Sequence, residues 1–77
     1  MDNTQERIIK LIAEHLGLPI DSILPDHGFS ELPMDSLDHV MLLMGVEDEF
    51  RIEIPDDDAE KWTSVADAVA YVRGRKP

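Results

Sequence analysis

The stretch that decides the fold is DSLDHVMLLMGVEDEF, residues 35–50. Asp35 can cap a helix that begins at Ser36, because a short acidic side chain satisfies free amides at a helix start. Asp38 in the first turn is favourably placed in the field of the helix amino end. The pattern therefore predicts a helix over residues 36–50.

Two apolar stripes lie on opposite sides of this predicted helix. With about 100° between successive residues, the core stripe consists of Leu42, Leu43, Val46 and Phe50. The opposite stripe consists of Leu37, Val40, Met41 and Met44. A helix that is apolar nearly all round is normally buried, yet a bundle this small rarely surrounds one completely. We therefore expect the second stripe to be an exposed binding patch, with simple central packing as the alternative.

Apolar residues at helical spacing also precede this stretch. They predict a first helix with a wide apolar arc of Ile8, Ile9, Leu11, Ile12, Ala13 and Leu16. Asn3 and Glu6 form a capping-box pattern at its start, and Gly17 closes it. Residues 18–34 predict a long packed loop with one helical turn, because Pro and Gly interrupt any longer helix. The apolar side chains available to pin this loop are Leu18, Ile23, Leu24, Phe29 and Leu32.

The remaining residues predict an extended link and two further helices. Residues 51–55 look extended, and a short acidic helix follows over about residues 56–62. Ser64 and Asp67 form a second capping-box pattern. A last helix follows and ends at Gly74, with an apolar face of Val65, Ala68, Val69 and Val72. These patterns predict one all-α domain over residues 1–77, a four-helix bundle of three longer helices and one short helix with a long first loop.

Composition narrows the classes of function. The 77 residues include no Cys and 17 acidic against 7 basic side chains, a net charge of -10. One small core leaves little room for a shielded catalytic pocket, and the negative field disfavours nucleic acid and anionic membrane surfaces. No apolar run approaches a membrane span, and the polar amino terminus lacks the pattern of a signal peptide. We expect a cytoplasmic monomer whose partners carry basic surfaces.

Histidines offer little catalytic chemistry. Ser36 and His39 are close on the predicted helix, but no orienting group or G-x-S-x-G turn accompanies them, which argues against a hydrolytic dyad. His39 falls beside Val46 and is expected to be a packed or half-exposed structural residue. His15 and His27 lack metal-ligand spacing and are expected to be isolated surface residues, so no metal site is predicted.

Four motifs in this order resemble the acyl carrier protein family of bacterial fatty-acid and polyketide synthesis. They are DSLD at residues 35–38, EDEF at 47–50, IEIPD at 52–56 and DAEK at 58–61, and the resemblance covers almost the whole chain. It implies a carrier, not an enzyme, whose Ser36 hydroxyl accepts a covalent 4'-phosphopantetheine arm. Acyl chains would be held as thioesters on the terminal thiol of that arm. A separate phosphopantetheinyl transferase would supply the base and the metal, so the resemblance implies no catalytic residue here.

The resemblance also implies a docking surface and an interior site. Acyltransferases, ketosynthases and other acyl-processing enzymes with basic patches would dock on the exposed stripe and its acidic rim, formed by Asp35, Leu37, Asp38, Val40, Met41, Met44, Glu47 and Asp48. The acyl chain could withdraw between the helices, among Leu42, Val46, Ile54, Ala59, Trp62, Ala68 and Val72.

Departures from the usual family pattern favour a specialised lipid or polyketide pathway. Pro33 stands where the family commonly has Gly, and the loop from Phe29 to Ser36 looks one residue shorter. Met41 replaces an acidic residue, and Trp62 replaces a smaller aliphatic residue. The indole of Trp62 either fills space that a long chain needs or lies over the bundle surface with its N–H in water. The alternatives are a housekeeping fatty-acid carrier, an aminoacyl or peptidyl carrier, and an acidic interaction bundle without an arm.

Overall fold

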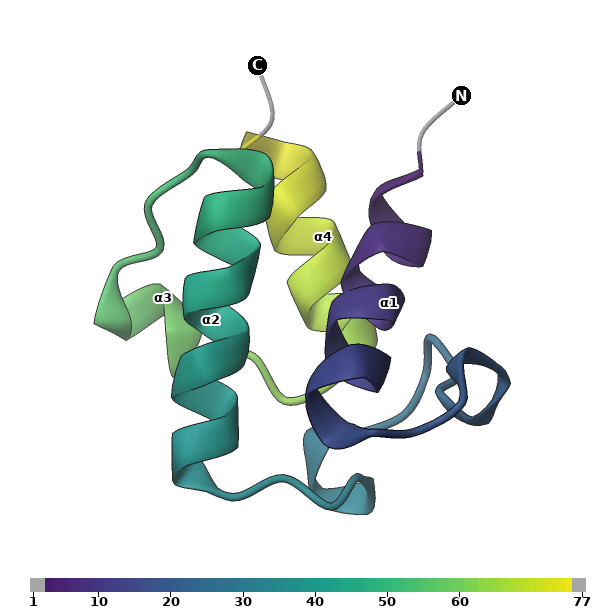
Figure 1. Ribbon diagram of the computed structural model, residues 1–77. Helices are drawn as coiled ribbons and strands as arrows, with labels where there is room; N and C mark the ends of the chain where they lie inside the picture. Colours follow the sequence, from purple (N-terminus) through teal and green to yellow (C-terminus); the bar gives the residue numbers. More distant parts are fainter. Residues whose placement is uncertain (1–2, 76–77) are drawn as a thin grey trace.

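Four α-helices and two single-turn 3₁₀ helices make up the regular structure of residues 3–75, the part that the computed structural model describes. The longer helices are α1 (Thr4–Leu16), α2 (Ser36–Phe50) and α4 (Val65–Arg75), and α3 (Asp56–Ala59) is a single turn. In Figure 1, α1 and α2 run in opposite directions with α4 beside them, while α3 lies on the outer side of α2. The predicted all-α bundle of three longer helices and one short helix is confirmed. None of the described helices is long and apolar enough to cross a bilayer.

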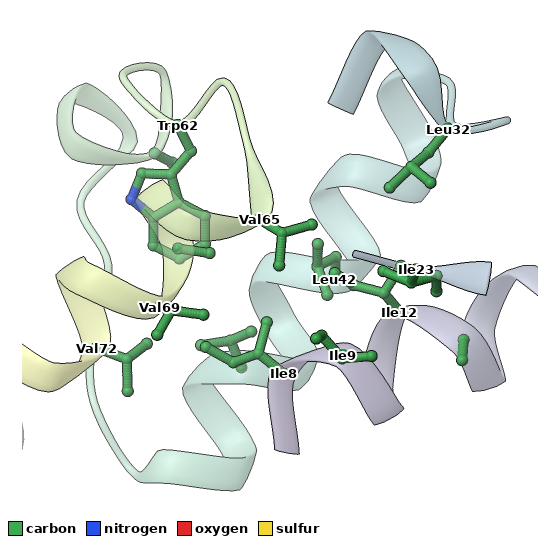
Figure 2. Packing of buried hydrophobic residues seen from close by; sticks show 14 of the residues in the cluster. Ile8, Ile9, Ile12, Ile23, Leu32, Leu42, Trp62, Val65, Val69 and Val72 are labelled. Atoms are coloured by element: carbon green, nitrogen blue, oxygen red, sulfur yellow. The ribbon is translucent and has the colours of Figure 1, made fainter. Parts of the chain in front are cut away.

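One hydrophobic cluster holds the helices together (Figure 2). Each CH₂ buried in such a cluster stabilises the folded protein by about 0.8 kcal/mol, so the helices pack with their apolar faces together. The fully buried large side chains come from all three longer helices: Ile8, Ile12, Val46, Val65 and Val72. Leu42 joins them, while Leu43 and Phe50 are half-buried at the edge. The predicted core stripe of α2 is therefore confirmed.

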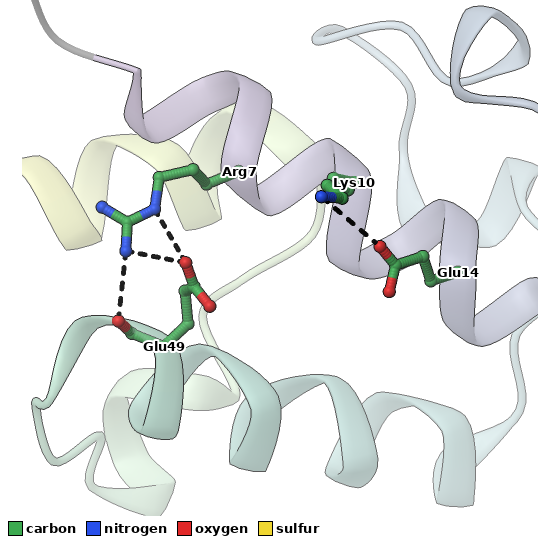
Figure 3. Close-up of polar contacts among 4 residues, drawn as sticks. All are labelled: Arg7, Lys10, Glu14 and Glu49. Carbon is green, nitrogen blue, oxygen red and sulfur yellow. Dashed lines mark hydrogen bonds and ion pairs between the residues drawn. The ribbon is translucent and has the colours of Figure 1, made fainter.

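Polar contacts fasten the start of α1 to the end of α2 (Figure 3). The Arg7 guanidinium pairs with the Glu49 carboxylate at 2.7 Å and also donates to the Glu49 carbonyl oxygen at 3.2 Å. The same guanidinium lies 4.4 Å from the centre of the Phe50 ring, a favourable position for a cation over an aromatic face. Lys10 and Glu14, at 3.9 Å, form a looser pair within α1.

The long first loop contains two helical turns, not the single turn predicted. These are η1 (Ile20–Ser22) and η2 (Phe29–Glu31). Ile23 and Leu32 are buried as expected, but Leu24 is half exposed and does not pin the loop. Backbone contacts tie the loop to the start of α4, because Phe29 donates to the Thr63 carbonyl at 2.9 Å and Val65 donates to the His27 carbonyl at 3.0 Å.

The structure corrects four expectations at helix ends. The Asn3 side chain makes no capping bond with a described residue, although α1 does begin after it. The predicted short helix over residues 56–62 stops at Ala59. At the start of α4 the Ser64 hydroxyl accepts from the Asp67 amide, but the Asp67 carboxylate accepts from the amide and hydroxyl of Thr63. Gly74 does not end α4, which continues to Arg75.

Two glycines provide a matched test of these helix ends. Gly17 closes α1 with φ of 70°, whereas Gly74 is helical and has open space where a Cβ would lie. Gly74→Ala should stabilise the protein by up to about 1 kcal/mol, because Ala loses less entropy in a helix. Gly17→Ala should destabilise it by about 1 kcal/mol, because a Cβ disfavours the left-handed conformation. Urea unfolding midpoints at unchanged slope measure both effects, and shifts of the same sign would contradict this account of the helix ends.

Candidate functional site

A reciprocal capping box fixes the start of α2. The Asp38 amide donates to the Asp35 carboxylate at 2.9 Å, and the Asp35 amide donates to the Asp38 carboxylate at 3.2 Å. These paired bonds satisfy two amides that a helix start otherwise leaves free. Ser36 is therefore the first helical residue, as predicted. Its side chain is exposed, and no residue in the described part of the chain hydrogen-bonds its hydroxyl.

The surroundings of Ser36 suit a phosphate ester. The amides of Ser36 and Leu37 lie in the first turn, where no earlier helical carbonyl can accept from them. Their N–H groups lie at the positive end of the helix dipole, and both features favour a nearby anion. An exposed hydroxyl at this point can thus carry a phosphodiester without burying its charge.

Asp38 also connects α2 to α1. Its carboxylate lies 2.9 Å from Nε2 of His15, so this histidine is not the isolated surface residue that the sequence suggested. The hydrogen bond from His15 is the main cause that lowers the pKa of Asp38, and the bond from the Asp35 amide acts in the same direction. The contact thus favours the ionised form of Asp38 and joins the end of α1 to the start of α2.

An apolar stripe faces outward along α2, opposite its buried face. Leu37 is 66% exposed and Met44 is 62% exposed, and Val40 and Met41 are each 49% exposed. The predicted exposure of these four side chains is confirmed, and central packing of this stripe is wrong. Exposed apolar side chains that lie together on one helix face are typical of an interaction surface.

The four acidic residues expected at the rim of this stripe differ in whether their carboxylates are already hydrogen-bonded. Asp35 and Asp38 are occupied by the capping box. Glu47 is half-buried and accepts from the Ile54 amide at 2.8 Å, which fastens the link between α2 and α3. Asp48 is exposed and pairs with no residue of the described chain. It lies beside an open groove of about 850 Å³ whose lining includes Met44, Ile52, Ile54 and Pro55.

The seven expected interior residues are all buried in the hydrophobic cluster: Leu42, Val46, Ile54, Ala59, Trp62, Ala68 and Val72. The Trp62 side chain is 6% exposed, so the surface placement of its indole is wrong. It packs edge-on against Tyr71, with ring centres 5.5 Å apart. The Tyr71 hydroxyl donates to the Asp58 carboxylate at 2.7 Å, and burial together with this bond raises the pKa of the phenol.

The other histidines have structural roles. His39 is half-buried and packs edge-on against Phe29 at 5.5 Å between ring centres, as its position beside the core stripe predicted. His27 is not isolated, because its Nδ1 accepts from the Leu24 amide at 3.0 Å. Sequence reasoning missed this contact and those of His15 and Tyr71, since each joins residues whose partners are set by the loop path or by helix packing.

Comparison with known proteins identifies the family. The sequence profile described as "Phosphopantetheine attachment site" matches residues 6–72. An acyl carrier protein from Zymomonas mobilis subsp. mobilis is 46% identical over 77 residues, which covers 99% of each chain. The matched domain carries covalent 4'-phosphopantetheine, and proteins of this kind deliver acyl groups to other enzymes instead of catalysing a reaction. The chain therefore belongs to the acyl carrier protein family.

Proposed function

We propose that Ser36 carries the 4'-phosphopantetheine arm. The observation that supports this assignment is its exposed hydroxyl at the first residue of a helix held by a complete capping box. Ser36 supplies the oxygen of the phosphoester bond, and the transferase that modifies the protein supplies the base, so the hydroxyl needs no activating neighbour. Once attached, the arm supplies a terminal thiol that holds acyl groups as thioesters. A capped helix start keeps the anchor in place while the arm moves.

Partner enzymes dock, in this proposal, on the exposed stripe of α2. Leu37, Val40, Met41 and Met44 supply the apolar contact, and Asp48 supplies a carboxylate that is free to meet a basic side chain. A carrier must leave each enzyme after its turn, so a small patch with charge steering suits it better than a large apolar interface. Asp35, Asp38 and Glu47 add negative potential to this surface while their hydrogen bonds keep α2 in shape.

The acyl chain is sheltered among the seven buried residues between the helices. Removing each CH₂ of the chain from water contributes about 0.8 kcal/mol, which favours entry into the apolar centre. The contacts that hold α3 come from side chains, namely Glu47 to the Ile54 amide before it and Tyr71 to Asp58 within it. Such contacts can yield without unfolding α1, α2 or α4, so the α3 side is the entrance that the structure favours.

We also propose a specialised lipid or polyketide pathway in place of general fatty-acid synthesis. Met41 is half exposed on the docking stripe, where it enlarges the apolar patch without adding charge. Trp62 occupies interior volume that a smaller side chain would leave to a long saturated chain. Met41 thus changes the surface that partners meet, and Trp62 changes the interior volume open to an acyl chain. The housekeeping role is the alternative.

Attachment at Ser36 is tested by intact-mass and peptide mass spectrometry after incubation with coenzyme A and a phosphopantetheinyl transferase. Wild-type protein and the control Ser30→Ala, which changes another exposed serine, should gain one arm. Ser36→Ala should gain none, yet unfold within about 1 kcal/mol of wild type, because its hydroxyl supports no core contact. Modification of Ser36→Ala would contradict the assignment.

Charge steering is tested by the transferase reaction itself. Asp48→Lys should lower kcat/KM about 1.4- to fivefold at low salt, because an exposed ion pair contributes about 0.2–1 kcal/mol. The loss should shrink as salt rises and screens the charges. Asp21→Lys is the matched control, since this exposed acid lies in η1, on the far side of α1 from α2 (Figure 1). Equal effects of the two substitutions at every salt concentration would contradict docking on this stripe.

The pathway proposal is tested in a bacterial strain depleted of its own fatty-acid carrier. The wild-type protein should support growth poorly even when mass spectrometry shows that it carries the arm. Met41→Glu with Trp62→Ile should improve growth, because the pair restores a charge and opens interior volume. Full growth with the wild-type protein would establish the housekeeping alternative.

A further inference from the structure

Trp62 holds a buried hydrogen-bond donor that the protein does not use. Its side chain is 6% exposed, and its Nε1 atom is fully buried without an acceptor among the described residues. Buried donors in native proteins are nearly always paired, because an unpaired one gives up its bonds to water and receives nothing in return. An unpaired indole N–H on a buried side chain therefore needs an explanation.

No neighbouring side chain among the described residues accepts from the indole nitrogen. Figure 2 shows the indole reaching from the segment after α3 toward Val69, with its nitrogen on the side away from Val65. The ring rests edge-on against Tyr71, whose hydroxyl donates to Asp58 at 2.7 Å and does not accept from the indole nitrogen. Packing in the hydrophobic cluster and against Tyr71 thus holds the ring without satisfying its nitrogen.

The seven buried residues that are proposed to surround the acyl chain include Trp62, so the chain is a candidate acceptor for its N–H. Beyond its thioester carbonyl a saturated chain offers only C–H groups, so inside the protein it would compete with the indole for space and leave the N–H unpaired. A chain with a carbonyl or hydroxyl oxygen could accept from this N–H. Sites that hydrogen-bond a polar group on a substrate discriminate more strongly than purely apolar pockets, because the analogue without that group leaves a buried donor unpaired.

We propose that Trp62 is a specificity-determining residue whose indole N–H donates to an oxygen on the carried acyl chain. The inference rests on the proposed function, since it requires a chain that is carried by Ser36 and enters the centre. It deepens that function by naming the cargo as acyl chains oxygenated along their length. The donor selects for oxygen, and the bulk of the ring selects against long saturated chains.

The test uses the full protein loaded enzymatically with chains of one length. Octanoyl, 3-hydroxyoctanoyl and 5-oxooctanoyl pantetheine arms are attached, and intact-mass spectrometry verifies each product. Trp62 is the sole tryptophan of the sequence, so its indole N–H gives a single ¹H–¹⁵N resonance that reports directly on the bond. Thermal unfolding of the same samples measures stabilisation. Trp62→Phe is the matched variant, because it keeps an aromatic ring and removes the donor.

At least one oxygenated chain should move the indole proton resonance downfield, while octanoyl should not. That chain should also raise Tm by about 4–8 °C more than octanoyl does, the shift expected for one added hydrogen bond in a domain of this size. The extra stabilisation should disappear in Trp62→Phe. An indole resonance that responds equally to all three chains would overturn the inference, even if the variant proved too unstable to compare. Failure to attach any arm at Ser36 would overturn the proposed function as well, and the mass measurement separates the two results.

Discussion

Burial of one face of α2 is the constraint on which the remaining structure depends. A chain of 77 residues hides only about 60% of the surface that it would expose when unfolded, so it cannot cover a central helix on all sides. Leu42 and Val46 are buried in the core, and the apolar residues on the opposite face of α2 remain exposed to water. The helix that stabilises the bundle is therefore also the helix that exposes an apolar stripe to solvent.

Helix α1 holds α2 in place through polar contacts at both ends of α2. Near its start Arg7 binds Glu49 at the end of α2, and near its end His15 binds Asp38 at the start of α2. Two polar contacts far apart on antiparallel helices resist sliding and tilting of one helix against the other. Individually, exposed pairs of this kind contribute little to stability. Here these pairs fix the positions of nearby residues. Ser36 lies two residues from Asp38, and Asp48 lies next to Glu49.

Local patterns predicted the parts of the fold that depend on neighbouring residues. The capping box of Asp35 and Asp38 and the opposed stripes of α2 could be read directly from spacing. Contacts between distant elements could not, which is why the roles of His15 and Tyr71 were missed. The Glu47 carboxylate looked like a rim charge, but the path of the chain after α2 brings the Ile54 amide to it. Trp62 could not be placed from its sequence neighbours because it follows the end of α3, where no helical period fixes its direction.

In the proposed function, a rigid helix start anchors a mobile arm. Amide hydrogen exchange, measured by NMR before and after attachment of the arm, tests that claim most directly. The Asp38 amide, which the capping box holds, should exchange slowly in both forms, while the amides of Ser36 and Leu37 should exchange fast until a phosphate is attached beside them. Exchange of the Asp38 amide as fast as that of Leu37 in the unmodified protein, or loss of its protection once the arm is attached, would contradict the account.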